Sequence, residues 1–265
     1  MLSALIVLPV SLLLLWFLLR GKKENPFPKG GALILLAGGA ICAIISGFLT
    51  IGLNLAAKVI VLGPEWLSSV VTAAKGGAGA SEALAKIQDV AAAAQTPSFI
   101  SIFLNTFITI ALVEEVIKYL AMLICTRREG MIRTWMDALV CGAIVGLGFN
   151  IFEDIIYSDG GPMVSIMRAF TPGHFCFSVI MGYYYGKALI TGKRGYRWAA
   201  VLLPALYHAA FDLGSRGMVQ NPENNFYPLF AVFMMIVTVA ATIVMVVKIN
   251  KWRKTGELDT AVPAK

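Results

Sequence analysis

The sequence predicts an all-α, polytopic membrane protein with about seven transmembrane helices. Of its 265 residues, 58% are hydrophobic and only 14% are charged, whereas roughly a quarter of a soluble domain is charged. Apolar runs of about 20 residues, long enough to cross a bilayer, recur along the chain. The excess Lys and Arg lie in short segments between these runs, which is typical of membrane topology signals and excludes nucleic acid as a partner. We therefore expect one integral membrane domain over residues 1–265, surrounded by membrane lipid.

The first two apolar runs, residues 2–19 and 31–57, precede the longest polar segment. Basic residues follow the first run instead of preceding it, so it is interpreted as a retained helix and not as a cleavable signal peptide. The second run is rich in Gly and Ala, which favours close helix packing. Residues 58–97 are predicted to be an extracytoplasmic loop with short helices opened by Pro64 and Ser81. This loop is interpreted as a spacer hairpin, with a substrate-gating lid as the alternative.

Five further apolar runs are predicted to span the membrane, and the fifth span is expected to break near Thr171 and Pro172. Residues 249–265 are predicted to be a loose, basic cytoplasmic tail. The four cysteines lie in or beside apolar runs without a CxxC pair, which indicates small buried side chains and no disulfide framework. The five runs are residues 99–125, 135–157, 163–190, 198–213 and 226–247.

The distribution of positive charge predicts a cell-membrane protein with its N-terminus outside and its C-terminus in the cytoplasm. With seven spans in that orientation, 16 of the 22 basic residues fall in cytoplasmic segments, as the positive-inside rule requires. The outer segments hold only Lys58, Lys75, Lys86 and Arg216, and Lys118 lies inside a span. Arg168 is interpreted as an outer snorkelling residue. The cytoplasmic groups are Arg20, Lys22, Lys23, Lys29; Arg127, Arg128, Arg133; Lys187, Lys193, Arg194, Arg197; and Lys248, Lys251, Arg253, Lys254, Lys265.

Ionisable side chains occur at depth in the third to sixth spans and are almost absent from the other three. A charge at the bilayer centre costs about 2.5–3.5 kcal/mol on insertion scales, so such residues usually face a protein interior or a water-filled cavity. We therefore expect residues 98–215 to form a four-helix catalytic core around one polar cavity. The residues that carry this prediction are Glu114, Glu115, Glu153, His174, His208 and Asp212.

Sequence spacing predicts which of these groups act together. His208 and Asp212 are four residues apart and share a helix face. Glu114 and Glu115 point about 100° apart, so one faces the cavity while the other pairs with Lys118. Residues 174, 178, 182 and 186 form a stripe of His, Ser and two Gly, which is expected to leave open backbone beside the histidine. Each pair also has a purely structural interpretation, and the concentration of all of them in four spans favours chemistry.

Four motifs in this order resemble the PrsW family of intramembrane proteases. Glu114-Glu115-Val-Ile-Lys118 is similar to an EExxK motif, and Phe149-Asn-Ile-Phe-Glu153 to an FxxxE motif. An isolated His174 follows, and then His208-Ala-Ala-Phe-Asp212, which is similar to HxxxD. The resemblance covers roughly residues 98–215, and it extends to the related CAAX-prenyl endopeptidases and bacteriocin-immunity proteins.

The resemblance implies an endopeptidase that hydrolyses a peptide bond in a single-pass, membrane-anchored substrate, with site-1 cleavage of an anti-sigma factor as the family's activity. Glu114 would then be the base that activates water, Glu115 would pair with Lys118, and His208 would stabilise the oxyanion. The sequence departs from the CAAX branch at two positions, because Glu153 replaces a histidine and Asp212 replaces an asparagine.

The cofactor and the function class both keep alternatives at this point. His174, His208 and Glu153 are a plausible ligand set for one Zn²⁺, but a metal-free glutamate mechanism needs the same residues, and no HExxH motif decides between them. Carboxylates and histidines at mid-membrane also suit a proton- or ion-coupled transporter, although no internal repeat typical of transporters is visible. A non-catalytic immunity or binding protein is the third alternative.

Overall fold

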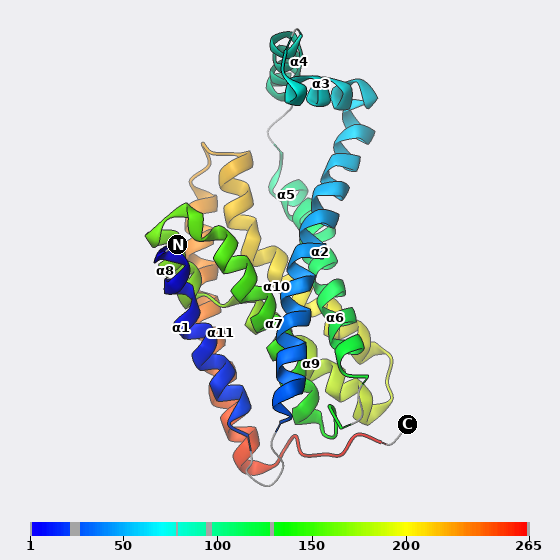
Figure 1. The fold of residues 1–265 in the computed structure, drawn as a ribbon, viewed down its shortest axis with the longest axis vertical. Helices are drawn as coiled ribbons and strands as arrows, with labels where there is room; N and C mark the ends of the chain where they lie inside the picture. The colour runs from blue at the N-terminus through cyan, green and yellow to red at the C-terminus, as the bar shows by residue number, and fades with distance from the viewer. Residues whose placement is uncertain (1, 22–26, 78, 94–96, 128–129, 264–265) are drawn as a thin grey trace.

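The computed structural model describes residues 2–21, 27–77, 79–93, 97–127 and 130–263, and this part of the chain is helical apart from turns and one isolated β-bridge (Figure 1). Of the residues used above to predict topology, Lys22, Lys23, Arg128 and Lys265 lie outside the described residues. The helices are α1 (Leu2–Leu19), α2 (Lys29–Leu62), α3 (Pro64–Lys75), α4 (Ala80–Ala93), α5 (Phe99–Thr106), π-helix η1 (Phe107–Ala111), α6 (Leu112–Cys125), α7 (Trp135–Tyr157), 3-10 helix η2 (Ser158–Gly160), α8 (Pro162–Phe170), α9 (Gly173–Thr191), α10 (Gly195–Gln220) and α11 (Phe226–Thr255).

The predicted all-α polytopic membrane fold is confirmed. Within the described residues, five helical segments are long and apolar enough to cross a membrane. The other two predicted spans are also helical: α1 contains a shorter apolar helix, and α10 carries His208 and Asp212 among its apolar residues. The five segments are Lys29–Ile60, Phe99–Cys125, Trp135–Gly160, Pro162–Thr191 and Phe226–Thr255.

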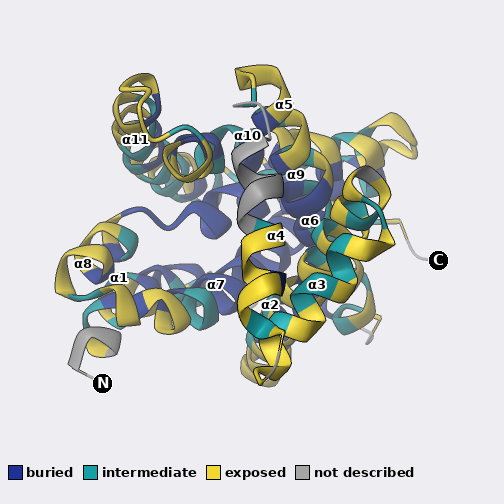
Figure 2. Ribbon diagram, turned by 90° about the horizontal axis from the view of Figure 1, so that it is seen from above, coloured by how far each residue is buried: buried dark blue, intermediate teal, exposed yellow. Residues whose placement is uncertain are grey.

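Helices α7 and α9 form the centre of the bundle, where buried residues predominate (Figure 2). Glycines on their facing sides let the two backbones approach closely. A Cβ atom on Gly146 would lie 2.3 Å from the His174 carbonyl oxygen, and one on Gly182 would lie 2.6 Å from the Ala138 carbonyl oxygen. The stripe from residue 174 to residue 186 is therefore packed against α7, and the expected open backbone beside the histidine is absent. This packing fixes the first turn of α9 against the second half of α7.

Helices α2, α6 and α10 surround this centre, while α1 and α8 pack together against α7, and α11 lies along α10. Leu33, Phe48 and Phe233, among many large apolar side chains on the outer faces of α2 and α11, are exposed. Such a surface is what lipid tails would cover.

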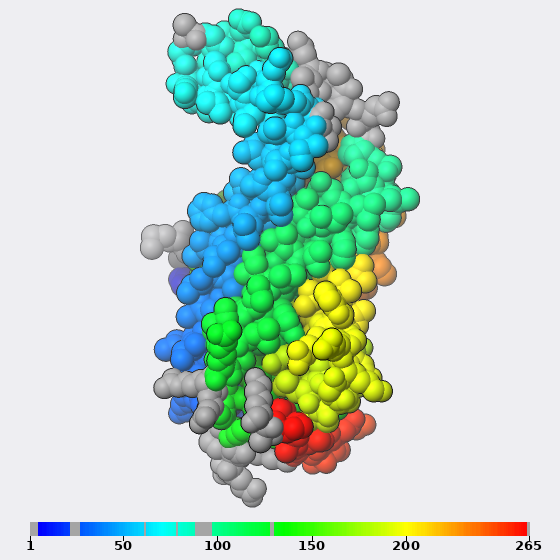
Figure 3. All heavy atoms as spheres, turned by 90° about the vertical axis from the view of Figure 1, so that its right-hand side faces the viewer, coloured from blue at the N-terminus to red at the C-terminus, as the bar shows by residue number. Residues whose placement is uncertain are grey.

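The loop predicted at residues 58–97 contains two helices, α3 and α4, which pack against each other beyond one end of the bundle (Figure 3). Gly63 and Gly76 bound α3 with positive φ angles of 84° and 68°, a conformation that favours glycine. No residue of α3 is buried. Helix α4 begins at Ala80, one residue before the predicted start at Ser81, and is described as far as Ala93, because residues 94–96 lie outside the described residues.

The prediction of a loose C-terminal tail is wrong. Helix α11 continues to Thr255, and the chain then returns to the start of α7, where Thr134 and Ala261 form an antiparallel bridge. The Trp135 and Met136 amides donate to the carbonyls of Thr260 and Leu258, and Leu258 is buried. The tail thus supplies acceptors for two amides at a helix start that would otherwise lack partners.

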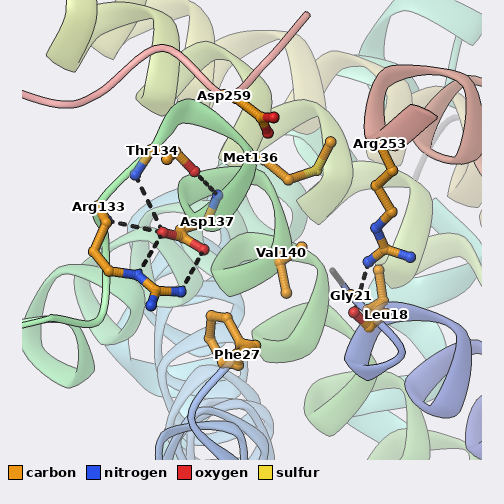
Figure 4. A pocket seen from close by; sticks show the side chains of 10 residues that line it. All are labelled: Leu18, Gly21, Phe27, Arg133, Thr134, Met136, Asp137, Val140, Arg253 and Asp259. Carbon is orange, nitrogen blue, oxygen red and sulfur yellow. Dashed lines mark hydrogen bonds and ion pairs between the residues drawn. The ribbon is translucent and has the colours of Figure 1, made fainter. Parts of the chain in front are cut away.

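A second contact fixes this end of the bundle, beside a pocket of about 280 Å³ (Figure 4). The Arg253 guanidinium donates to the carbonyl oxygens of Phe17 and Leu18, at 2.7 Å and 2.6 Å, and so caps the end of α1. On the other side of the pocket, Arg133 and Thr134 donate to the Asp137 carboxylate. These contacts tie α1, α7 and α11 together.

Candidate active site

The acidic pair lies in the first turn of α6, directly after η1. Glu115 and Lys118 are both fully buried, and Lys118 Nζ donates to Glu115 Oε1 at 2.6 Å. Glu114 points to a different side, as successive helical residues must. Its side chain is nearly buried, and its Oε2 atom has no hydrogen-bond partner among the described residues. A π-helical turn within an α-helix often marks a functional site, and here it ends at Ala111, three residues before Glu114.

His174 is the second residue of α9, just after the break that Thr171 and Pro172 make between α8 and α9. Its Nδ1 lies 2.8 Å from Lys118 Nζ, and its Nε2 lies 2.7 Å from Glu153 Oε2. A lysine ammonium can only donate and a carboxylate can only accept. Nδ1 of His174 must therefore accept, and Nε2 must carry the ring proton.

Glu153 is also held by Arg168, and this contact contradicts the interpretation of Arg168 as an outer snorkelling residue. The guanidinium donates to Glu153 Oε2 and to Asp154 Oδ1, each at 2.7 Å. Arg168 lies in the last turn of α8, and the turn at residues 158–161, which contains η2 and Gly161, leads α8 back against α7. The only signal in the sequence was that Arg168 is a basic residue within a predicted span and has no acidic residue three or four positions away.

His208 connects the acidic pair to α10. Its Nδ1 lies 3.1 Å from Glu115 Oε1, and its Nε2 faces Asp212 Oδ2 at 3.4 Å and Glu114 Oε2 at 3.8 Å. The ring stacks on Phe177 with centroids 4.8 Å apart. Because Nδ1 faces an acceptor, it carries a proton, and Nε2 is directed toward the space between Glu114 and Asp212.

The six predicted residues are thus brought together in the described structure. A small cavity of about 50 Å³, enough for at least one water molecule, is lined by four of them, Glu153, His174, His208 and Asp212, but not by Glu114 or Glu115. The sequence did not single out Asn150, whose side-chain amide donates to Asp154. The cavity is lined by Asn150, Glu153, Arg168, Thr171, Gly173, His174, Phe177, His208, Phe211 and Asp212.

Comparison with known proteins places the chain in a family. Residues 63–242 match the model described as PrsW family intramembrane metalloprotease, which is more than half of the chain. The chain belongs to the PrsW family. It is 37% identical over 113 residues to Protease PrsW of Geobacillus kaustophilus (strain HTA426), covering 41% of this chain and 50% of the relative. No solved structure shows significant similarity to it.

Two other PrsW relatives match over different lengths. Protease PrsW of Oceanobacillus iheyensis is 28% identical over 162 residues, covering 59% of this chain and 70% of the relative. Protease PrsW of Clostridioides difficile (strain 630) is 32% identical over 118 residues, covering 40% of this chain and 50% of the relative. The chain thus spans about half the length of the Geobacillus and Clostridioides relatives that it matches.

The family description names a metalloprotease, and a metal would need ligand atoms at suitable distances with free lone pairs. Facing atoms of Glu114, His174 and His208 lie within 4.8 Å of one another, and two His with one Glu is a known catalytic zinc set. Zinc–ligand bonds of about 2.0–2.2 Å would require these three ligand atoms to lie closer together. Moreover, the Nδ1 of His174 is occupied by Lys118 and its Nε2 proton by Glu153. His174 therefore has no free lone pair, and the arrangement does not fit a three-ligand metal site.

Proposed function

We propose that this chain is an intramembrane endopeptidase in which Glu114 activates water without a metal ion. The observation that carries the proposal is the carboxylate of Glu114, which is nearly buried, has an unpartnered Oε2 atom and faces His208 across 3.8 Å. A buried carboxylate without a partner is costly, so a polar ligand such as water is its natural complement. Membership in the PrsW family supports the protease activity, although the family description names a metalloprotease.

In the proposed reaction, a water molecule donates a proton to Glu114 while its oxygen attacks the carbonyl carbon of the substrate. The resulting tetrahedral intermediate carries its negative charge on the former carbonyl oxygen. Glu114 then returns the proton to the leaving nitrogen as the C–N bond breaks, which yields a carboxylic acid and an amine. One water molecule is consumed for each bond that is cleaved.

His208 is proposed to donate from Nε2 to the oxyanion. Glu115 accepts from Nδ1 at 3.1 Å, fixes the ring orientation and balances positive charge on the ring. Asp212 lies 3.4 Å from Nε2, so it holds this proton in the resting site until the substrate oxygen replaces it. The Asp212 carboxylate is thus proposed to accept a hydrogen bond from this proton temporarily, a role that the asparagine of the CAAX branch would not need to fill.

The remaining residues are proposed to position the pair. Lys118 donates to both Glu115 and His174, and its ammonium lies 4.3 Å from the centre of the Phe149 ring. His174 in turn donates to Glu153, which Arg168 also holds. Positive and negative groups alternate along this chain of contacts, so it links α6, α7, α8 and α9 without an unpaired charge.

The substrate is proposed to be a single-pass membrane protein, with an anti-sigma factor cleaved at site 1 as the specific candidate. This assignment rests on the resemblance of the four motifs, and the membrane-embedded position of the cluster is consistent with it. The same proposal places the N-terminus outside and the C-terminus in the cytoplasm, because the basic segments then lie inside.

The proposal is tested with purified protein and a single-pass substrate reconstituted in liposomes. We expect cleavage by the unmodified chain, loss of cleavage in Glu114→Gln and in His208→Ala, and unchanged folding of Glu114→Gln by circular dichroism. Equal cleavage by Glu114→Gln would refute the role of Glu114. Uptake of protons or ions without any cleavage would instead indicate a transporter.

A further inference from the structure

A second, larger cavity lies outside the cluster described above, at the end of the bundle that carries α3 and α4. This groove has a volume of about 790 Å³, within the range of clefts that bind ligands. Its walls come from the outer part of α2, from α5 and from the end of α10, and Trp66 of α3 contributes beside them. Figure 1 shows α3 crossing the end of α2 at this level. The polar and aromatic residues that matter here are Asn54, Lys58, Trp66, Asn105, Arg216 and Gln220.

The charged residues that line this groove are both basic. Lys58 and Arg216 lie on α2 and α10, and no carboxylate lines the groove in the described part of the chain. Lys58 Nζ lies 5.4 Å from the centre of the Trp66 ring. Thr50, which also lines the groove, has a buried Oγ1 atom without a hydrogen-bond partner among the described residues. Two cations and an unpartnered hydroxyl suit an occupant that is acidic and has polar backbone groups.

Two helical segments connect the residues of the groove with those of the candidate active site. Arg216 follows His208 by eight residues on α10, which corresponds to about 12 Å along the helix. Asn105 precedes Glu114 by nine residues on the segment formed by α5, η1 and α6. An extended peptide covers about 3.3–3.6 Å per residue, so about four residues of substrate would reach from the reacting carbonyl to the groove.

We propose that this groove is an exosite for an acidic juxtamembrane segment of the substrate. The acidic side chains lie about four residues from the scissile bond, on the side that leaves the membrane toward α3 and α4. Lys58 and Arg216 bind them from opposite walls, and the side-chain amides of Asn54, Asn105 and Gln220 bind the peptide backbone between them. This inference rests on the proposed protease activity and adds the class of sequence that the enzyme selects.

A peptide fits this groove better than an anionic lipid headgroup does. A headgroup presents a compact phosphate, for which clustered cations are the main requirement. Here the two cations lie on different helices, and amide side chains from three helices line the space between the walls. Side-chain amides offer both donors and acceptors, which an extended backbone can use along its length.

The experiment uses the full chain in liposomes, two single-pass substrates and two lipid mixtures. The substrates differ only in the fourth and fifth residues from the scissile bond toward the α3–α4 side, which are Asp-Asp in one and Lys-Lys in the other. The liposomes contain phosphatidylcholine alone or with phosphatidylglycerol. The test variant is Lys58→Glu/Arg216→Glu, and the matched control is Lys75→Glu, which changes an exposed basic residue of α3 outside the groove.

We expect the unmodified chain to cleave the Asp-Asp substrate with a kcat/KM about tenfold higher than the Lys-Lys substrate, as two partly screened ion pairs allow. The double variant should reverse this preference, and the control should keep it. Cleavage by the unmodified chain with no reversal in the variant overturns the exosite but not the protease. A change that follows phosphatidylglycerol content and not substrate charge overturns it in favour of a lipid site. Absence of any cleavage overturns the proposed function first.

Discussion

Asp137 and Glu114 occupy the same position in two helices, the third residue of α7 and the third residue of α6. Their exposures are alike, at 9% and 8%. The Asp137 carboxylate accepts hydrogen bonds from the backbone amides of Arg133 and Thr134 and from the Arg133 guanidinium. Glu114 Oε2 has no such partner among the described residues. Burial alone therefore does not separate these two carboxylates, whereas the number of donors around them does. Glu115, whose Oε2 atom also lacks a partner among the described residues, is held through its Oε1 atom by Lys118 and His208.

The same contrast separates the two regions that contain them. Around Asp137, the pocket in Figure 4 is bordered by groups that cap helix ends. Arg253 of α11 caps the end of α1, and Thr134 and Asp137 form the capping box at the start of α7. Around Glu114, the polar groups hold one another, but the Oε2 atoms of Glu114 and Glu115 lack hydrogen-bond partners among the described residues, and the Glu114 atom faces the His208 ring nitrogen. The first arrangement stabilises a fold, and the second can bind and polarise a reactant.

The largest expected effect is the loss of activity in Glu114→Gln. Removing a general base lowers the rate by about 1,000-fold, while the amide keeps the size of the side chain and removes an uncompensated charge. Cleavage rates should fall by this factor, and the melting temperature in detergent should stay the same or rise. A melting temperature that falls together with activity would mean that Glu114 is structural, like Asp137.

The next largest effect concerns the buried pair of Glu115 and Lys118. Lys118→Met should destabilise the protein by about 3–5 kcal/mol, because Glu115 is left charged and fully buried without its main partner. The double variant Glu115→Gln/Lys118→Met should recover most of that loss, as measured by denaturant unfolding in mixed micelles. If the two substitutions contribute additively, the pair is not coupled as the 2.6 Å contact requires.

Asp137→Ala should lower the stability by a smaller amount and, unlike Glu114→Gln, leave the activity unchanged. The loss of the capping box and of the contact with Arg133 should cost about 2 kcal/mol. The activity per folded molecule should stay within twofold of the unmodified chain, because Asp137 lies at the other end of α7 from Glu153. An activity loss greater than the loss of folded protein would link this pocket to the chemistry.

The smallest expected effect is that of metal removal. Because His174 has both ring nitrogens engaged, dialysis against a chelator should change the cleavage rate by less than about twofold. Elemental analysis of active protein should find zinc well below one equivalent. Inhibition by the chelator that added zinc reverses would show that His174 changes its partners to bind a metal.

Hydropathy and short-range spacing were sufficient for the outline of the fold and for two of the pairs in the site. Spacing predicted that one of the two glutamates pairs with Lys118, and the family resemblance assigned that role to Glu115, which the structure confirms. The spacing of four residues placed His208 beside Asp212. Both pairs lie within single helices, where sequence separation determines which side chains meet.

Contacts between helices were not predictable in the same way. Glu115 meets His208 across 93 residues, and Lys118 meets His174 across 56. Arg168 faces the site because α8 turns back against α7, which no local pattern encodes. The docked tail was missed because a short polar segment has no periodicity from which its packing could be inferred.

The π-helix η1, Phe107–Ala111, sets the rotational phase between the two ends of the segment that contains it. Nine residues of regular α-helix make two and a half turns, which would put Asn105 and Glu114 on opposite sides. A π turn accommodates one additional residue, equivalent to about 100° of rotation, and so brings Asn105 of the groove closer to the side of Glu114. Deleting one residue from Phe107–Ala111 would leave eight residues of regular α-helix between the two, which turn through about 800° and keep that alignment. In genetic terms, a single-codon deletion here should preserve both substrate selection and cleavage.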